Sequence, residues 1–293
     1  MIANPRDPLV ADLDAALRAQ SIDLARAALI IARLEYPALE ADPYVQRLDR
    51  LGDQARARVR RISGRSIRAR LTALNGLLFE DEGFSGNHQH YDDFRNSFLN
   101  IVLDRRLGIP ITLALVYMEV ARRAGIEVQG VSFPGHFLMR VPIPDAEAGS
   151  EEILLDPFDA GVELDVADCR KLLGRHLGGH DDGPFDPALL RPCSRRHMLA
   201  RMLNNLKRTY VEQRSFGHAR RVTNLLLTVD PLLLSELRDR GLLSYHLDDW
   251  PAALRDLEDY LRLRGWKDDA DQEEHQQIVD HVKTLRRRIA GTN

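Results

Sequence analysis

The segment from Gly108 to Gly125 constrains the fold most, because its side chains are apolar nearly all the way round a helix. A helix that is apolar on every face has to be buried inside a domain. Pro110 suits the first turn, where a backbone N–H has no helical partner to lose, and Gly125 suits the residue that closes the helix. We therefore expect this segment to be the central helix of a domain.

After this helix the pattern changes to short apolar runs bounded by Pro and Gly, which is typical of strands. The runs cover 128–133, 136–141 and 152–156. The polar segment 142–150 between the last two runs has the composition of a hairpin loop. One buried helix packed on a small antiparallel sheet is an α+β arrangement, and this is the fold class that we predict.

Helices are expected on both sides of this core. Asp7-Pro8 and Asp42-Pro43 each place an acid before a proline, which predicts a helix start, and further helices are expected over about 66–80 and 92–103. The C-terminal part repeats with a period of 34 residues, which resembles tetratricopeptide repeats. The pairs that define this period are Phe216 and Trp250, Ala219 and Ala253, Leu227 and Leu261, and Leu203 and Leu237.

The composition excludes several classes of function. A net charge of −3 over 293 residues gives no field that would attract nucleic acid or a membrane surface. Two cysteines, Cys169 and Cys193, form neither a disulfide framework nor a zinc pattern, and the N-terminus lacks a signal-peptide pattern, so we expect a cytoplasmic protein. The histidines of two loops, His88-Gln-His90 and His176 with His180, do not have zinc spacing, and no phosphate-binding loop is present. We expect no metal and no cofactor.

Three short motifs indicate where a site should lie. His136 begins one expected strand and Asp156 ends the next, and in an antiparallel pair these two positions are neighbours. The first turn of the buried helix, Pro110 to Thr112, would face the same place with its free N–H groups. A histidine oriented by an aspartate beside a helix start suits acyl transfer, although a strand start can also hold a histidine for structural reasons.

Residues from about Leu74 to Phe158 resemble the transglutaminase-like core, in the bacterial subfamily that joins this core to C-terminal tetratricopeptide repeats. Members are often labelled as regulators of invasion-gene expression. The resemblance implies that His136 is the base and that Asp156 orients it. In the wider superfamily a cysteine begins the buried helix. The segments that carry the resemblance are 95–100, 103–112, 121–125, Pro134-Gly135-His136-Phe137 and Asp156-Pro157-Phe158.

In this chain the nearest side chain able to replace that cysteine is Thr112. A threonine hydroxyl stays protonated and is hindered by its β-branch, and threonine nucleophiles usually rely on their own N-terminal amine. Cysteine-type chemistry is therefore not expected. A retained histidine–aspartate pair would still be compatible with slow hydroxyl-based hydrolysis or with peptide binding.

Four further residues could support the cleft. Asn96 and Asn100 are four apart, so on one helix they would share a face and could donate hydrogen bonds to a bound carbonyl or cap a neighbouring loop. Asp104 and Arg105 precede the buried helix, where they could form an ion-pair clamp on this turn or recognise an anionic group.

We predict an N-terminal helical segment over 1–65, a transglutaminase-like core over 66–190 and a tetratricopeptide-like region over 191–293. The first hypothesis for function is a cytoplasmic, regulatory module that binds a protein or peptide, with a degenerate cleft that is non-catalytic or weakly active. The alternative is a hydrolase or acyl-transferase that uses Thr112 as nucleophile, His136 as base and Asp156 as orienter. Neither hypothesis involves nucleic acid or a membrane.

Overall fold

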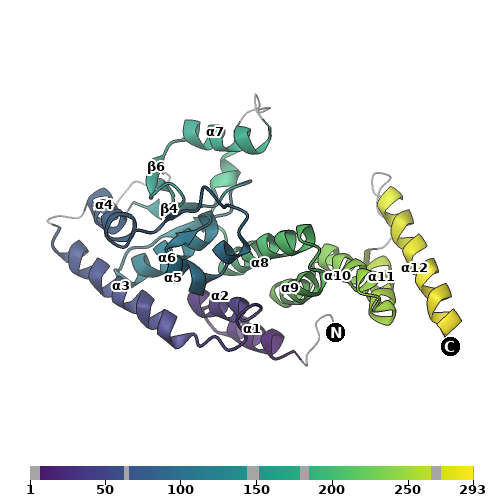
Figure 1. The fold of residues 1–293 in the computed structure, drawn as a ribbon. Helices are drawn as coiled ribbons and strands as arrows, with labels where there is room; N and C mark the ends of the chain where they lie inside the picture. Colours follow the sequence, from purple (N-terminus) through teal and green to yellow (C-terminus); the bar gives the residue numbers. More distant parts are fainter. Residues whose placement is uncertain (1–6, 63–65, 144–151, 179–184, 265–271, 293) are drawn as a thin grey trace. The chain divides into compact units, whose positions relative to one another are not determined.

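The computed structural model describes residues 7–62, 66–143, 152–178, 185–264 and 272–292 (Figure 1). The chain forms two compact units. One is Ala19–Met202, and the other joins Met1–Arg18 to Leu203–Asn293. The fold mixes helices with a small sheet, so the predicted α+β class is confirmed. The domain boundaries expected at residues 65 and 190 stay predictions.

The central helix of the larger unit is α6 (Pro110–Arg123). Eleven of its residues are buried, including Tyr117, which confirms the prediction of a helix enclosed on all sides. Gly125 follows it with φ +80°, a left-handed conformation that glycine adopts without strain. The other helical elements of this unit are α2 (Leu24–Ala32), α3 (Asp42–Arg60), α4 (Ile67–Asn75), η1 (Gly76–Asp81), η2 (Phe94–Ser97), α5 (Leu99–Arg105), α7 (Val166–His176) and η3 (Pro187–Leu190).

The sheet has four antiparallel strands that neighbour one another in sequence order: β3 (Gln129–Val131), β4 (Leu138–Pro142), β5 (Glu152–Asp156) and β6 (Val162–Leu164). Met139 of β4 pairs with Leu155 of β5, as expected for adjacent antiparallel strands. A second, two-stranded parallel pair, β1 (Ser85–Gly86) with β2 (Leu107–Gly108), was not predicted. Two residues are too short a run to show a periodic pattern.

The helix expected over 92–103 is divided into η2 and α5. Phe98, between them, is extended, with φ −103° and ψ 120°. Its buried ring packs edge-on against Tyr36 and Phe94, at centroid distances of 5.7 and 6.2 Å. Because this packing outweighs the local helical pattern, Asn96 and Asn100 lie on different helices, and the expectation that they share one helix face was wrong.

The smaller unit consists of α1 (Pro8–Arg18) with α9 (Phe216–Val229), α10 (Leu234–His246), α11 (Trp250–Arg264) and α12 (Gln272–Thr292). Helix α8 (Arg195–Glu212) contains the point at which the chain passes from one unit to the other. Phe216 and Trp250, which are 34 residues apart in sequence, both begin helices. Among the described residues, no helix is both long enough and apolar enough to cross a membrane.

Candidate functional site

The site is built around a hydrogen bond between His136 and Asp156. His136 Nε2 lies 2.9 and 3.0 Å from the two carboxylate oxygens of Asp156. Asp156 is the last residue of β5, and His136 lies in the turn two residues before β4, so the antiparallel pairing of these strands brings the two together. Asp156 is only 6% exposed and also accepts a hydrogen bond of 2.8 Å from the backbone N–H of Phe158.

The turn before β4 fixes the position of the histidine. Gly135 has φ +67°, a left-handed conformation that favours glycine, and the His136 backbone N–H donates to Phe133 O at 3.1 Å. The ring of His176, at the end of α7, occupies the space where a Cβ on residue 135 would stand. Gly135 therefore serves the geometry of the turn, and Pro134 stands immediately before it.

The orientation of the imidazole leaves its second nitrogen available. A carboxylate accepts hydrogen bonds, so in the neutral ring Nε2 carries the proton and Nδ1 carries the lone pair. Within the described parts of the chain, no group hydrogen-bonds to the Nδ1 atom of His136. This nitrogen could accept a proton or a hydrogen bond from a bound molecule.

Thr112 is engaged elsewhere. It is the third residue of α6 and is fully buried. Its hydroxyl donates to Asn96 O at 2.8 Å and accepts a hydrogen bond of 3.1 Å from the backbone N–H of Ile109. Because the hydroxyl has a single proton, donation to Asn96 O leaves none for a base. In this structure Thr112 holds the first turn of α6, beginning at Pro110, against η2.

Aromatic side chains lie against the histidine. The Phe158 ring lies edge-on to His136 with a centroid distance of 6.1 Å, and it contacts the His88 ring at 4.3 Å and the Tyr91 ring at 5.7 Å. Gly86 has no side chain because a Cβ there would come within 2.7 Å of the Phe158 ring. From the sequence, His88 was considered only as a metal ligand and this cluster was not predicted, although Phe158 follows Asp156 by two residues.

Asn96 caps a loop, which was one of the two interpretations left open by its sequence position. Its Nδ2 donates to the carbonyls of His90 and Tyr91 at 2.8 and 3.2 Å, and its Oδ1 accepts from Asn87 Nδ2 at 3.0 Å. Asn100 is 2% exposed, and its Oδ1 has no hydrogen-bond partner among the residues described. The two asparagines are therefore not a matched pair of donors.

Ion pairs fix the turn before α6. Arg105 contacts Asp93 at 3.0 Å, and Asp104 accepts hydrogen bonds from Tyr44 at 3.1 Å and Arg47 at 3.3 Å. Burial would raise the pKa of Asp93, but hydrogen bonds from Arg95 and Arg105 outweigh it and lower that pKa to about 2. The contacts of Asp104 and Arg105 are thus those of the clamp rather than of an open anion site.

The two cysteines are not activated. Burial, followed by the charges of Asp168, Asp165 and Asp156, raises the pKa of the Cys169 thiol to about 11. Burial also raises the pKa of Cys193. A thiol reacts as its thiolate, so neither cysteine is poised as a nucleophile at neutral pH. Among the described residues, no cluster of His, Cys, Asp and Glu side chains could hold a metal ion; His180 lies outside these residues.

This geometry belongs to a known class of protein. The chain belongs to the transglutaminase-like superfamily, whose family model matches residues 42–204, and a tetratricopeptide repeat model matches residues 206–287. Its relatives include UPF0162 proteins. The one from Xylella fastidiosa strain Temecula1 is 41% identical over 247 residues, which cover 83% of this chain and 85% of the relative. The one from Pseudomonas aeruginosa is 35% identical over 263 residues, which cover 88% of this chain and 90% of the relative.

A eukaryotic relative shares only part of its length with this chain. The human F-box only protein 21 is 33% identical over 189 residues, which cover 62% of this chain but 28% of that protein. The predicted resemblance to a transglutaminase-like core with C-terminal tetratricopeptide repeats is confirmed by these matches.

Proposed function

We propose that this chain is a cytoplasmic, regulatory module that binds a protein or peptide and that its transglutaminase-like cleft is non-catalytic. A transglutaminase-like domain followed by tetratricopeptide repeats fits a protein-binding module. The cleft would contribute one binding surface and the helical repeats a second.

The position of the Thr112 hydroxyl carries this proposal. Acyl transfer needs a nucleophile whose proton can pass to a base within hydrogen-bond reach. The Thr112 hydroxyl instead donates to Asn96 O and accepts from Ile109 N–H inside the protein core. To react, it would have to break both hydrogen bonds, each worth about 1 kcal/mol net, and leave buried polar groups unpaired.

The groups around His136 suit recognition of a peptide. Nδ1 of His136 can accept a hydrogen bond from a peptide N–H. Beside it, the rings of Phe158, His88 and Tyr91 offer aromatic faces to an apolar or aromatic side chain. His88 and Tyr91 are exposed in the larger unit, so a ligand could reach them. Such a site would bind a segment of a partner without reacting with it.

The lengths of the relatives are consistent with a binding module that can be joined to other domains. In the human F-box only protein 21 the matching region is 28% of a much longer chain, so this region occurs in combination with other sequence. In the present chain, the helical unit exposes Leu232, of which 84% is accessible. An exposed large apolar side chain is a candidate contact for a partner.

The alternative, a hydrolase or acyl-transferase, is favoured by one observation. The His136–Asp156 pair has the geometry of a base and its orienter, and none of the described residues hydrogen-bonds to Nδ1. A ligand that shifted the first turn of α6 could release the Thr112 hydroxyl toward it. This reaction class therefore has to be tested directly.

A fluorophosphonate-type probe, which traps activated hydroxyls, separates the two functions. We expect no labelling of the wild-type chain, with or without an extract of its source organism as a source of partner. Labelling of the wild type that disappears in both Thr112→Val and His136→Ala would establish the enzyme and overturn the proposal.

Binding is tested by immobilising the full-length chain on a resin and measuring which proteins it captures from the same extract. Proteins captured by the wild type should be kept by Thr112→Val, once its fold is verified by circular dichroism, and should be reduced by His88→Ala or Leu232→Lys. The last two residues are exposed, so these changes leave the core intact. Capture that depends on none of these residues would contradict the proposed surfaces.

A further inference from the structure

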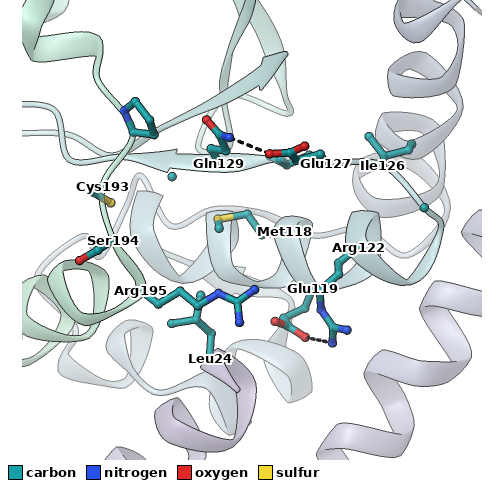
Figure 2. A pocket seen from close by; sticks show the side chains of 14 residues that line it. Leu24, Met118, Glu119, Arg122, Ile126, Glu127, Gln129, Cys193, Ser194 and Arg195 are labelled. Atoms are coloured by element: carbon teal, nitrogen blue, oxygen red, sulfur yellow. Dashed lines mark hydrogen bonds and ion pairs between the residues drawn. The ribbon is translucent and has the colours of Figure 1, made fainter. Parts of the chain in front are cut away.

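A pocket of about 750 Å³ lies in the larger unit, beside the outer edge of β3 (Figure 2). Met118 and Glu119 of α6 line it on one side, and Gln129 of β3 lines it on another. The segment Pro192–Arg195 and Leu24 complete the lining. The volume falls within the range of about 300–1,000 Å³ that is typical of ligand sites.

This pocket is separate from the His136 cleft. His136 lies just before β4 and Asp156 at the end of β5, whereas the pocket is lined by later turns of α6 and by β3. Thr112 and Met118 are six residues apart, which corresponds to about 9 Å along a helix axis. None of the residues that line the pocket takes part in the His136–Asp156 pair.

Strand β3 is an edge strand, and part of its outer edge is unpaired. Val131 and Gln129 pair with β4 on the inner side, while Gly130 O faces outward and accepts a hydrogen bond of 2.8 Å from Cys193 N–H. In an extended backbone the N–H and C=O groups of every second residue point to the same side. The backbone groups of Val128, two residues before Gly130, therefore also point outward, and Val128 lines the pocket. Among the described residues, neither the N–H nor the C=O of Val128 has a hydrogen-bond partner.

A carboxylate oxygen on α6 also lacks a hydrogen-bond partner among the described residues. The Glu119 side chain is only 6% exposed, and its Oε2 atom accepts hydrogen bonds from Arg122 and Arg123. Its Oε1 atom has no hydrogen-bond partner among the described residues, and Glu119 lines the pocket. This oxygen can accept a hydrogen bond from an N–H or O–H group of a ligand in the pocket.

The charged side chains of the lining already make hydrogen bonds within the protein, and their charges sum to zero, which favours an uncharged ligand over an ionic one. Arg122 contacts Glu119 at 2.8 Å, and Gln129 donates to Glu127 at 2.7 Å. Arg195 donates to Ile22 O at 2.6 Å and also to a nearby hydroxyl, so its guanidinium is engaged. Two acids and two arginines balance in net charge. The remaining surface is apolar and includes Leu24, Met118 and Ile126.

We propose that this pocket binds an extended, uncharged peptide segment of a partner protein, which adds to the outer edge of β3. Its backbone pairs with the N–H and C=O of Val128, and one of its N–H groups donates to Glu119 Oε1. An apolar side chain of the segment enters the pocket over Met118. Addition of a strand to an exposed sheet edge is a recurring mode of peptide recognition.

The test is a selection from a displayed library of random linear 12-residue peptides on the full-length chain, followed by affinity measurements on synthetic copies by calorimetry. We expect enriched peptides with an apolar residue flanked by uncharged ones. Val128→Pro removes the outward N–H and should weaken peptide binding about fivefold, since one hydrogen bond of about 1 kcal/mol is lost. Val128→Ala is the matched control and should change affinity less than about twofold.

Two further measurements do not depend on how well Val128→Pro folds. Met118→Trp fills the pocket from the helix and should also weaken binding. The second measurement changes the peptide and leaves the protein unchanged. Two versions of the peptide are N-methylated, one at the odd-numbered and one at the even-numbered amides, and only the version that loses the N–H groups facing β3 should fail to bind.

The inference is overturned if no peptide is enriched, or if enriched peptides bind Val128→Pro and Met118→Trp as tightly as the wild type. His136→Ala should leave this binding unchanged. Peptides that lose affinity for His136→Ala but not for Val128→Pro would place peptide binding in the cleft, which contradicts this inference and supports the proposed function.

Discussion

The change Thr112→Val tests whether this residue is structural. Valine keeps the β-branch and nearly the same volume, so the substitution opens almost no cavity and mainly deletes the hydroxyl. The buried Ile109 N–H then loses its acceptor at 3.1 Å, which costs about 1–3 kcal/mol. Asn96 O loses a donor at 2.8 Å, which costs about 1 kcal/mol more. We expect a total loss of about 2–4 kcal/mol from the larger unit.

The assay has to report on the larger unit alone, because a chain with two units need not unfold in one step. Hydrogen exchange of the α6 amides that follow Pro110 does this, and protection should fall by a factor of about 30 to 1,000. Trp250 lies in the smaller unit, and the other tryptophan, Trp266, follows it in sequence outside the described residues, so tryptophan fluorescence serves as an internal reference and should not change.

Thr112→Ser is the matched control for this experiment. It keeps the hydroxyl and removes only a methyl group, so we expect a loss of about 1 kcal/mol. Protection of α6 in Thr112→Val that stays within threefold of the wild type would refute the reasoning. The hydroxyl would then contribute too little to the helix start to be explained as structural, and its assignment as a nucleophile would become the better one.

Two further predictions concern stability. His136→Ala should cost about 1–3 kcal/mol in urea unfolding, because buried Asp156 loses its partner; a double-mutant cycle with Asp156→Ala that shows no coupling would contradict the pairing. The folded-state pKa of Asp93, about 2, lies below its ordinary value of 3.8, so its stabilisation is present above about pH 4 and is lost as the pH falls toward 2. Because Asp93 is partly in contact with water, we expect about 1–2 kcal/mol; Asp93→Asn should remove this acid-dependent loss, and an unchanged pH profile of the urea midpoint would disprove it.

Several features of the fold follow from local sequence patterns. The apolar segment that became α6 has no face to present to water, so its burial could be inferred without knowing its neighbours. The runs that became β3, β4 and β5 are short and bounded by Pro and Gly, and the order of β4 and β5 was enough to expect His136 beside Asp156. The 34-residue spacing likewise predicted the tetratricopeptide-like repeat, and the structure adds that Phe216 and Trp250 of this spacing begin α9 and α11.

Other features depend on partners that are distant in the sequence. Phe98 interrupts a helical pattern because its ring is needed in a core formed with Tyr36, which is 62 residues away. Helix α1 packs against α9, from the opposite end of the chain. Local propensity cannot anticipate such contacts, since the free energy that decides them comes from packing between separate segments.

The candidate site likewise has one part that could be predicted from the sequence and one that could not. The sequence by itself determined that a histidine and an aspartate would meet at the adjoining ends of two strands, because antiparallel pairing fixes which residues are neighbours. Only the tertiary structure decided what Thr112 does, because its hydroxyl could bond either to an imidazole or to the backbone. Asn96 O and Ile109 N–H lie within 3.1 Å of that hydroxyl, and burial makes their satisfaction obligatory.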